Sequence, residues 1–336
     1  MNDVQNRGRA MRALALLAAA ALLATPSPAA EPKDAARRAV AVTVDDLPAI
    51  STQRDLATHR EITDKLVTGF QRHRIAAIGF VNEAKLTYDA QGRSDPDGEA
   101  KAERIALLER WLDAGLELGN HTYSHPSLFR MPLERFQANV LRGERVTRRL
   151  LASKDRALTF FRHPFLNTGP DVATKDAFEA FLTQHGYRVA PVTIDNSEWI
   201  FARAYDNALD RDDAALTQRI VDAYLEYMDA MFAYTEAQSK ALLGYELEQI
   251  LLLHANRLNA DHLDALVAMI RQRGYRFISL EEALEDKAYS RPDRYAGRAG
   301  ISWLHRWAIT EGKPAAFFGN EPETPGFVTE AADLQN

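Results

Sequence analysis

The chain has 336 residues, of which 46% are hydrophobic and 26% charged, with a formal net charge of −6 and no cysteine. This is the composition of a globular protein that can bury a sizeable core. The sequence has no long basic stripe, which argues against nucleic acid as a partner. Without cysteine, any metal ion must be held by nitrogen and oxygen ligands.

The N-terminus has the three-part pattern of a secretory signal peptide. Three arginines precede an apolar run of twelve residues, Ala13 to Ala24, and small residues follow up to Ala30. Such a run is well short of the ~20 residues that span a bilayer. We therefore expect residues 1–30 to be removed near Ala29 or Ala30, with export to the periplasm or the medium and no transmembrane segment in the mature chain.

Apolar, strand-like runs alternate with helical patterns along residues 39–285. Strands are predicted at 39–44, 75–81, 116–119, 158–161, 187–194, 249–253 and 275–278, and helices at 56–72, 99–114, 132–151, 170–185, 258–272 and 280–284. This alternation predicts an α/β fold, a distorted parallel (β/α) barrel of seven or eight units.

Two segments depart from the alternation. Residues 201–244 are acidic, aromatic and helical in pattern, which predicts a helical insertion in the barrel before the strand at 249–253. It serves either as scaffold or as a cap over a substrate groove, with Tyr205 as a candidate contact. Residues 291–336 form a C-terminal extension, with a helix around Trp303 and Trp307 and a disordered tail from about residue 321. The barrel proper is expected to span residues 31–290.

Polar residues follow five of the predicted strands. They are the pair Asp45-Asp46, the pair His121 and His125, Arg162, Glu198-Trp199, and His254. The carboxyl ends of parallel barrel strands share one face, so these residues should converge there. The two histidines are four positions apart, and on a helical turn they would face the same way.

One aspartate and two histidines make a three-ligand set of the catalytic type, with a coordination position left for substrate or water. This set suits Zn²⁺, with Co²⁺, Ni²⁺ and Mn²⁺ as alternatives. A second aspartate can act as a general base, and a separate histidine as a general acid. The combination predicts metal-assisted hydrolysis of an amide or an ester.

The segments that carry these residues resemble the motifs of the polysaccharide deacetylase family, the NodB-homology carbohydrate esterases. Thr43-Val-Asp-Asp-Leu-Pro48 is similar to the family's T-F-D-D-G-P, and His121-Thr-Tyr-Ser-His125 to its H-[ST]-x-x-H. Arg162-His-Pro-Phe165, Asn196-Ser-Glu-Trp199 and Leu252-Leu-His254 resemble the three remaining motifs. The resemblance runs from about residue 39 to 285 and implies a barrel of the NodB-homology type.

The resemblance also implies a role for each matching residue. Asp45 would be the general base, held by Arg162, and His254 the general acid. Asp46, His121 and His125 would be the metal ligands. The backbone N–H of Phe165 would help to bind the oxyanion, and Leu252 and Trp199 would line the acetyl pocket.

The sequence departs from the family pattern at two motif positions. Leu47 stands where the family has glycine, which could narrow the site. Glu198 stands where the family has aspartate, so either Glu198 or Asp195 could be the partner that tunes His254.

The resemblance implies a deacetylase acting on an N- or O-acetylated carbohydrate, such as peptidoglycan, a chitin-type oligosaccharide or another surface glycan. One alternative is an amidase of the same fold that acts on a small non-sugar C–N bond, which a narrow closed pocket would favour. The other is a non-catalytic glycan-binding protein, for which a retained base and acid would be superfluous.

Overall fold

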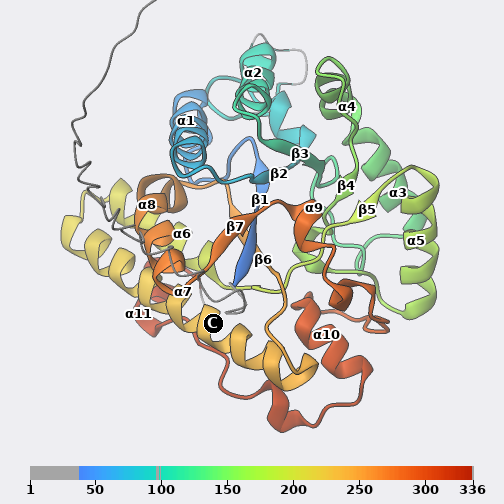
Figure 1. Ribbon diagram of the computed structural model, residues 1–336. Helices are drawn as coiled ribbons and strands as arrows, with labels where there is room; N and C mark the ends of the chain where they lie inside the picture. Colours follow the sequence, from blue (N-terminus) through green and yellow to red (C-terminus); the bar gives the residue numbers. More distant parts are fainter. Residues whose placement is uncertain (1–37, 96–97, 99, 335–336) are drawn as a thin grey trace, which may run out of the picture. The chain divides into compact units, whose positions relative to one another are not determined.

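The computed structural model describes residues 38–95, 98 and 100–334, and its centre is a seven-stranded parallel sheet (Figure 1). The strands are β1 (Ala39–Leu47), β2 (Ile78–Val81), β3 (Glu117–Asn120), β4 (Phe160–Phe161), β5 (Arg188–Val189), β6 (Gln249–His254) and β7 (Arg276–Ile278). Each overlaps a predicted strand, although β1 extends further, to Leu47, β2 begins later, at Ile78, and β5 contains only Arg188 and Val189. The α/β class and the curled parallel sheet are confirmed.

Helices connect the strands and cover the sheet. They are α1 (Leu56–His73), α2 (Ala100–Asp113), α3 (Leu133–Arg142), α4 (Arg145–Ala152), α5 (Val172–Gln184), α6 (Glu198–Asp210), α7 (Ala214–Leu243), α8 (Arg257–Gln272), α9 (Leu280–Ala283), α10 (Trp303–Thr310) and α11 (Gly326–Ala331). Four short 3-10 helices, η1 to η4, span Glu83–Thr87, Pro164–Leu166, Lys287–Ser290 and Ala315–Phe318. Among the described residues, none of the helices combines the length and the apolar character needed to cross a membrane.

The sheet curls around β1. Its order is β5-β4-β3-β2-β1-β6, and β7 pairs with the first half of β1. Beyond β5 the chain runs back to the other edge, where Ile194 forms a parallel bridge with Leu251 of β6. All nine residues of β1 are buried, as expected for a central strand of a parallel sheet covered by helices. Their alternating Ala, Val and Thr side chains suit this position because β-branched residues pack well on a pleated surface.

The predicted helix at 132–151 is two helices, α3 and α4, which separate at Gly143. A Cβ atom on Gly143 would lie 2.3 Å from the backbone nitrogen of Tyr123, so only glycine allows this close approach. The break therefore lets the chain pass directly against the loop that carries His121 and His125.

The segment predicted as a helical insertion is occupied by α6 and α7, and α6 begins earlier, at Glu198. Tyr205 on α6 is buried and its hydroxyl donates to Asp261 Oδ2 (2.9 Å), which places it in the helix packing rather than against a substrate.

The C-terminal tail, expected to be disordered, contains α11, and this expectation is corrected. Val328 and Ala332 are fully buried, and the carbonyl oxygens of Ala331 and Ala332 accept hydrogen bonds from side chains of α6. These contacts outweigh the polar, proline-containing composition that suggested disorder. The predicted signal peptide lies outside the described residues, and export stays a prediction.

Candidate active site

The strand register brings the base and acid candidates together. In the pairing of β1 with β6, Asp45 lies directly opposite His254. β3 ends immediately before His121 and β4 immediately before Arg162, so both follow strands at the same edge of the sheet. The predicted convergence is found.

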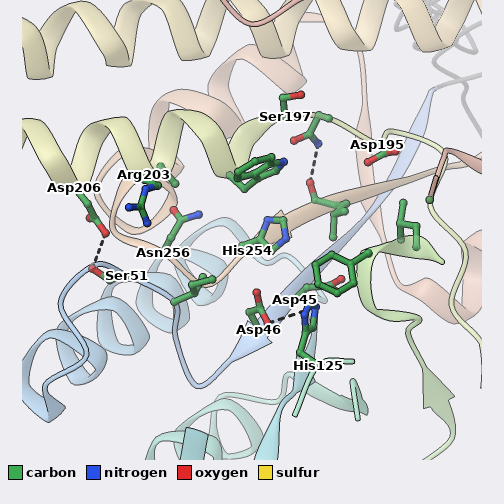
Figure 2. A pocket seen from close by; sticks show the side chains of 18 of the residues that line it. Asp45, Asp46, Ser51, His125, Asp195, Ser197, Arg203, Asp206, His254 and Asn256 are labelled. Atoms are coloured by element: carbon green, nitrogen blue, oxygen red, sulfur yellow. Dashed lines mark hydrogen bonds and ion pairs between the residues drawn. The ribbon is translucent and has the colours of Figure 1, made fainter. Parts of the chain in front are cut away.

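Asp46, His121 and His125 form a cluster that could hold a metal ion. One side-chain ligand atom from each lies within 4.8 Å of the others, and His125 Nε2 is 4.0 Å from Asp46 Oδ1 (Figure 2). His121 Nδ1 is 2.8 Å from the carbonyl oxygen of Arg162, which can only accept. The proton therefore sits on Nδ1, and Nε2 keeps its lone pair, as in histidines that bind metal through Nε2.

The protonation states of these side chains suit a cation. Burial lowers the pKa of His121 to about 3 and that of His125 to about 4, so both rings are neutral at neutral pH. Burial alone would raise the pKa of Asp46, but the charge of Lys85, followed by the two histidines, lowers it well below its usual range. Neutral imidazoles and an ionised carboxylate are the forms that bind metal, so the residues present fit a divalent ion.

The two histidines do not lie on a helical turn, contrary to the sequence-based prediction. They belong to a loop in which Thr122 (φ 69°) and His125 (φ 57°) both adopt the left-handed conformation. Thr122 N donates to Asn120 Oδ1 (2.7 Å), and His125 N donates to Thr122 Oγ1 (3.0 Å). These local side-chain bonds stabilise a tight loop in place of helix.

Asp46 (φ 72°) and Phe165 (φ 57°) are also left-handed. For residues other than glycine this conformation costs roughly 1–2 kcal/mol. Backbone strain of this kind persists where the surrounding structure imposes it, and it is concentrated at functional sites. Its recurrence at Asp46, His125 and Phe165 supports a functional reading of this edge.

Asp45 is held from behind by Arg162. The guanidinium Nη1 lies 3.2 Å from Asp45 Oδ1 and 3.3 Å from Oδ2, while Nη2 donates to Thr43 Oγ1 (2.9 Å) and Nε to the carbonyl oxygen of Ala190 (2.8 Å). Arg162 is fully buried. Burial raises the pKa of Asp45, and the charges of Arg162 and His254 oppose that rise. Asp45 therefore has a fixed position and basicity above that of an exposed aspartate.

Glu198, not Asp195, is the partner of His254. Glu198 Oε2 is 2.8 Å from His254 Nδ1, and its other oxygen accepts from the side-chain amides of Asn256 and Asn259. Burial alone would lower the pKa of His254, but the Glu198 carboxylate raises it to about 9. Glu198 is the first residue of α6, and from this position its side chain, one methylene longer than aspartate, reaches His254.

A cavity of about 1210 Å³ opens over these residues. Its lining includes Asp45, Asp46, His121, His125 and His254, together with Phe165, Trp199, Leu252 and Asp195. Phe165 is 59% exposed and Trp199 is 47% exposed, so both present large apolar surfaces to a ligand. Arg162 and Glu198 lie behind this lining. All eleven predicted site residues are thus in or next to one cavity.

Leu47 does not narrow the cavity. It is fully buried, and its side chain fills the space over Gly79 of β2, where an added Cβ atom would lie 2.4 Å from Leu47 Cδ2. The leucine is therefore accommodated by a glycine on the neighbouring strand.

Several functional contacts have no signal in the sequence. Lys85 Nζ lies 3.1 Å from Asp46 Oδ1 and donates to its carbonyl oxygen (2.8 Å). The side-chain amides of Asn256 and Asn259 donate to Glu198. Of these two residues, only Asn256 lies directly beside a predicted site motif, two positions after His254. The ring nitrogens of His163 are buried and have no hydrogen-bond partner among the described residues.

Residues 33–190 match the family model described as "Polysaccharide deacetylase". This segment belongs to the polysaccharide deacetylase family. The resemblance inferred from the motifs is thereby confirmed over the part of the chain that contains Asp45, Asp46, His121, His125 and Arg162. No curated protein matches the sequence.

Similar solved structures have low sequence identity. Peptidoglycan deacetylase PdaC from Bacillus subtilis is 20% identical, with 76% of this chain and 96% of that chain covered and a TM-score of 0.45. A family 4 carbohydrate esterase from Streptomyces lividans, in complex with acetate, is 17% identical (73% and 95% covered, TM-score 0.44). A CE4 family pseudoenzyme from Bacillus anthracis is 13% identical (74% and 66% covered, TM-score 0.43).

Proposed function

We propose that this protein is a metal-dependent deacetylase that hydrolyses N- or O-acetyl groups on a carbohydrate. The observation that carries the proposal is the position of Asp45 and His254, on neighbouring strands and in one cavity with the cluster of Asp46, His121 and His125. The family of residues 33–190 supports acetyl as the acyl group that is removed and a glycan as its carrier.

Asp46, His121 and His125 would hold the metal ion. When bound, a divalent ion there supplies Lewis acidity toward the acetyl carbonyl oxygen and makes a nearby water molecule more acidic. We favour Zn²⁺ because two imidazoles and one carboxylate are ligands that it commonly takes, with Co²⁺, Ni²⁺ and Mn²⁺ as alternatives.

The chain's own groups perform the proton transfers. Asp45, oriented by Arg162, accepts a proton from the attacking water. His254, kept protonated by Glu198, donates a proton to the departing amine or hydroxyl of the sugar. The backbone N–H of Phe165 would donate to the oxyanion of the tetrahedral intermediate. Trp199 and Leu252 would contact the acetyl methyl group.

One feature weighs against an amidase of small non-sugar substrates, and another against a non-catalytic glycan-binding protein. The cavity of about 1210 Å³ is larger than the roughly 300–1,000 Å³ of typical small-molecule sites, which favours an oligosaccharide over a small amide. A protein that only binds glycan has no need for the Asp45–Arg162 and His254–Glu198 pairs.

The test is acetate release from acetylated oligosaccharides by the purified protein. We expect release that stops on chelation, returns on addition of Zn²⁺, and is lost in His121→Ala together with bound metal, measured by elemental analysis. Activity that survives both chelation and His121→Ala would overturn the proposal. Stoichiometric metal without turnover on any acetylated glycan would favour the binding protein instead.

We also propose that the protein acts after export, with residues 31–290 as the catalytic barrel and residues 291–336 contributing to its cavity. The N-terminal sequence of the protein recovered from the producing cell tests the export step. A mature start near Glu31 supports it, and retention of the first thirty residues contradicts it.

A further inference from the structure

One side of the cavity carries two arginines whose charges are not neutralised by a carboxylate among the described residues. Arg54 follows β1 in the loop that leads to α1, and Arg203 lies on the first half of α6. Both are exposed, and both line the cavity. Among residues 38–95, 98 and 100–334, no carboxylate is within ion-pair distance of either guanidinium.

The side chain of Arg203 and the backbone of Arg54 are each held by a hydrogen bond, and neither bond neutralises the charge of the arginine. Arg203 Nε donates to the carbonyl oxygen of Ala332 (2.9 Å), which fixes the side chain and leaves both Nη groups for another partner. The carbonyl oxygen of Arg54 accepts from Arg104 Nη2 (3.0 Å), which anchors the loop at the base of its side chain. The Arg203 guanidinium, fixed in this way, loses little conformational entropy when it binds an oxyanion, whereas at Arg54 only the backbone is anchored.

The nearest acids already have other partners. Asp206 Oδ2 accepts from Ser51 Oγ (2.6 Å) and from Thr52 N (2.9 Å). Arg257 lies 3.7 Å from Asp206 and 3.5 Å from Asp210. Because Arg257 is shared between these two aspartates, the five side chains Arg54, Arg203, Arg257, Asp206 and Asp210 together carry one net positive charge.

The opposite side is acidic. Figure 2 shows Arg203 beside Asp206 and Asn256, and Asp195 across the cavity, with His254 between them. Glu321, from the C-terminal extension, also lines the cavity. Asp195 and Glu321 also line a second, small cavity together, so their side chains are close. Burial and the charge of Glu321 raise the pKa of Asp195 to about 7, so this carboxyl group is only partly ionised at neutral pH. An anionic group is therefore favoured on the arginine side of the reacting centre over the side that carries these two carboxyl groups.

We propose that Arg203 and Arg54 form a subsite for an oxyanion substituent of the glycan, so that the substrate is an acidic acetylated oligosaccharide. The inference rests on the proposed deacetylase function and names its substrate class. Arginine binds carboxylate, sulfate and phosphate oxygens through paired N–H donors. A sugar next to the acetylated unit would place its anionic group on the arginines. The reverse orientation would place that group beside the carboxyl groups of Asp195 and Glu321, which offer it no positive charge.

The test compares three defined oligosaccharides of equal length: a neutral N-acetylglucosamine oligomer, a hyaluronan fragment that carries carboxylates, and a chondroitin sulfate fragment that adds sulfates. We expect higher kcat/KM for an anionic substrate, and the hyaluronan and sulfated arms show which oxyanion fits. Arg203→Gln should lower the ratio of anionic to neutral kcat/KM roughly tenfold or more, the loss typical of one charged hydrogen bond. Arg54→Gln should act in the same direction.

Arg135→Gln is the matched control, because Arg135 is an exposed arginine on α3, and it should leave the ratio as in the wild type. Equal loss on neutral and anionic substrates in Arg203→Gln would overturn the subsite, and so would a preference for the neutral oligomer.

A binding measurement separates failure of the subsite from failure of the proposed function. Calorimetric titration of the three oligosaccharides needs no turnover. Tighter binding of an anionic one, weakened by salt and by Arg203→Gln, supports the subsite even if no acetate is released. Acetate release with no such difference in binding keeps the function and refutes the subsite.

Discussion

Replacement of Glu198 by glutamine removes the charge that keeps His254 protonated. In the wild type, the bond from His254 Nδ1 to Glu198 Oε2 (2.8 Å) and the carboxylate charge raise the His254 pKa to about 9. In Glu198→Gln, burial dominates, and we expect the pKa to fall to its ordinary 6.5 or below. At about 1.4 kcal/mol per pKa unit, the carboxylate favours the imidazolium by about 3 kcal/mol.

The consequence for activity follows from the sign of this change. A proton donor works while it is protonated, so the alkaline limb of the pH profile should move to lower pH by about two units. Near pH 8, the protonated fraction of His254 should fall roughly thirtyfold, and kcat/KM with it. A bound cation repels the imidazolium in both proteins, so the difference between the two profiles is the quantity to compare.

The assay is acetate release as a function of pH for the wild type, Glu198→Gln and Glu198→Asp. The aspartate variant keeps the charge on a shorter side chain and should lie between the other two. Glu226→Gln, at an exposed position on α7, is the control and should retain the wild-type profile. An alkaline limb in Glu198→Gln at the wild-type pH would refute the reasoning, because His254 would then not depend on this carboxylate.

Three further substitutions test other parts of the site. Arg162→Gln leaves Asp45 buried without its cation, so unfolding in urea should show a loss of about 3 kcal/mol or more, and the acid limb of the pH profile should move to higher pH. Lys85→Met removes a cation 3.1 Å from Asp46, so calorimetry should show metal binding tighter by several-fold, and weaker binding would contradict this. Val328→Asp puts a charge into the buried face of α11, which should lower the free energy of unfolding by roughly 2 kcal/mol or more and raise KM, because Arg203 loses its acceptor on Ala332.

The strands and the convergence of the site could be predicted because each depends on a short stretch of sequence. A buried parallel strand is a local apolar run, and the polar residues that follow such runs meet at one edge whatever connects them. The partner of Asp46 could not be found in this way. Lys85 is 39 positions away, on a short helix with no motif, and only the packing of η1 beside β1 brings the ammonium to the carboxylate.

The wrong predictions have the same physical origin. The spacing of His121 and His125 fits a helical turn, but the side-chain oxygens of Asn120 and Thr122 accept backbone hydrogen bonds that fold this stretch into a loop. The tail beyond residue 321 has the composition of a disordered segment, yet α11 is stabilised by tertiary contacts with α6 that local propensity does not contain.

The division of the site along the chain bears on where substrate choice is determined. The family match ends at residue 190, and the part before it contains the candidate metal ligands and the proposed base. The proposed acid, His254, and its partner Glu198 come later, on β6 and α6. The cavity walls at Arg203 and Glu321 come from the insertion helix and the C-terminal extension. The proposed deacetylation chemistry therefore draws on both parts. Fit to a particular glycan would also draw on both, because Arg54 and Phe165 precede residue 190 whereas Arg203 and Glu321 lie beyond the match. Substitutions at Arg203 or Glu321 should then change which oligosaccharide is preferred, while those at His121 should abolish turnover of all of them.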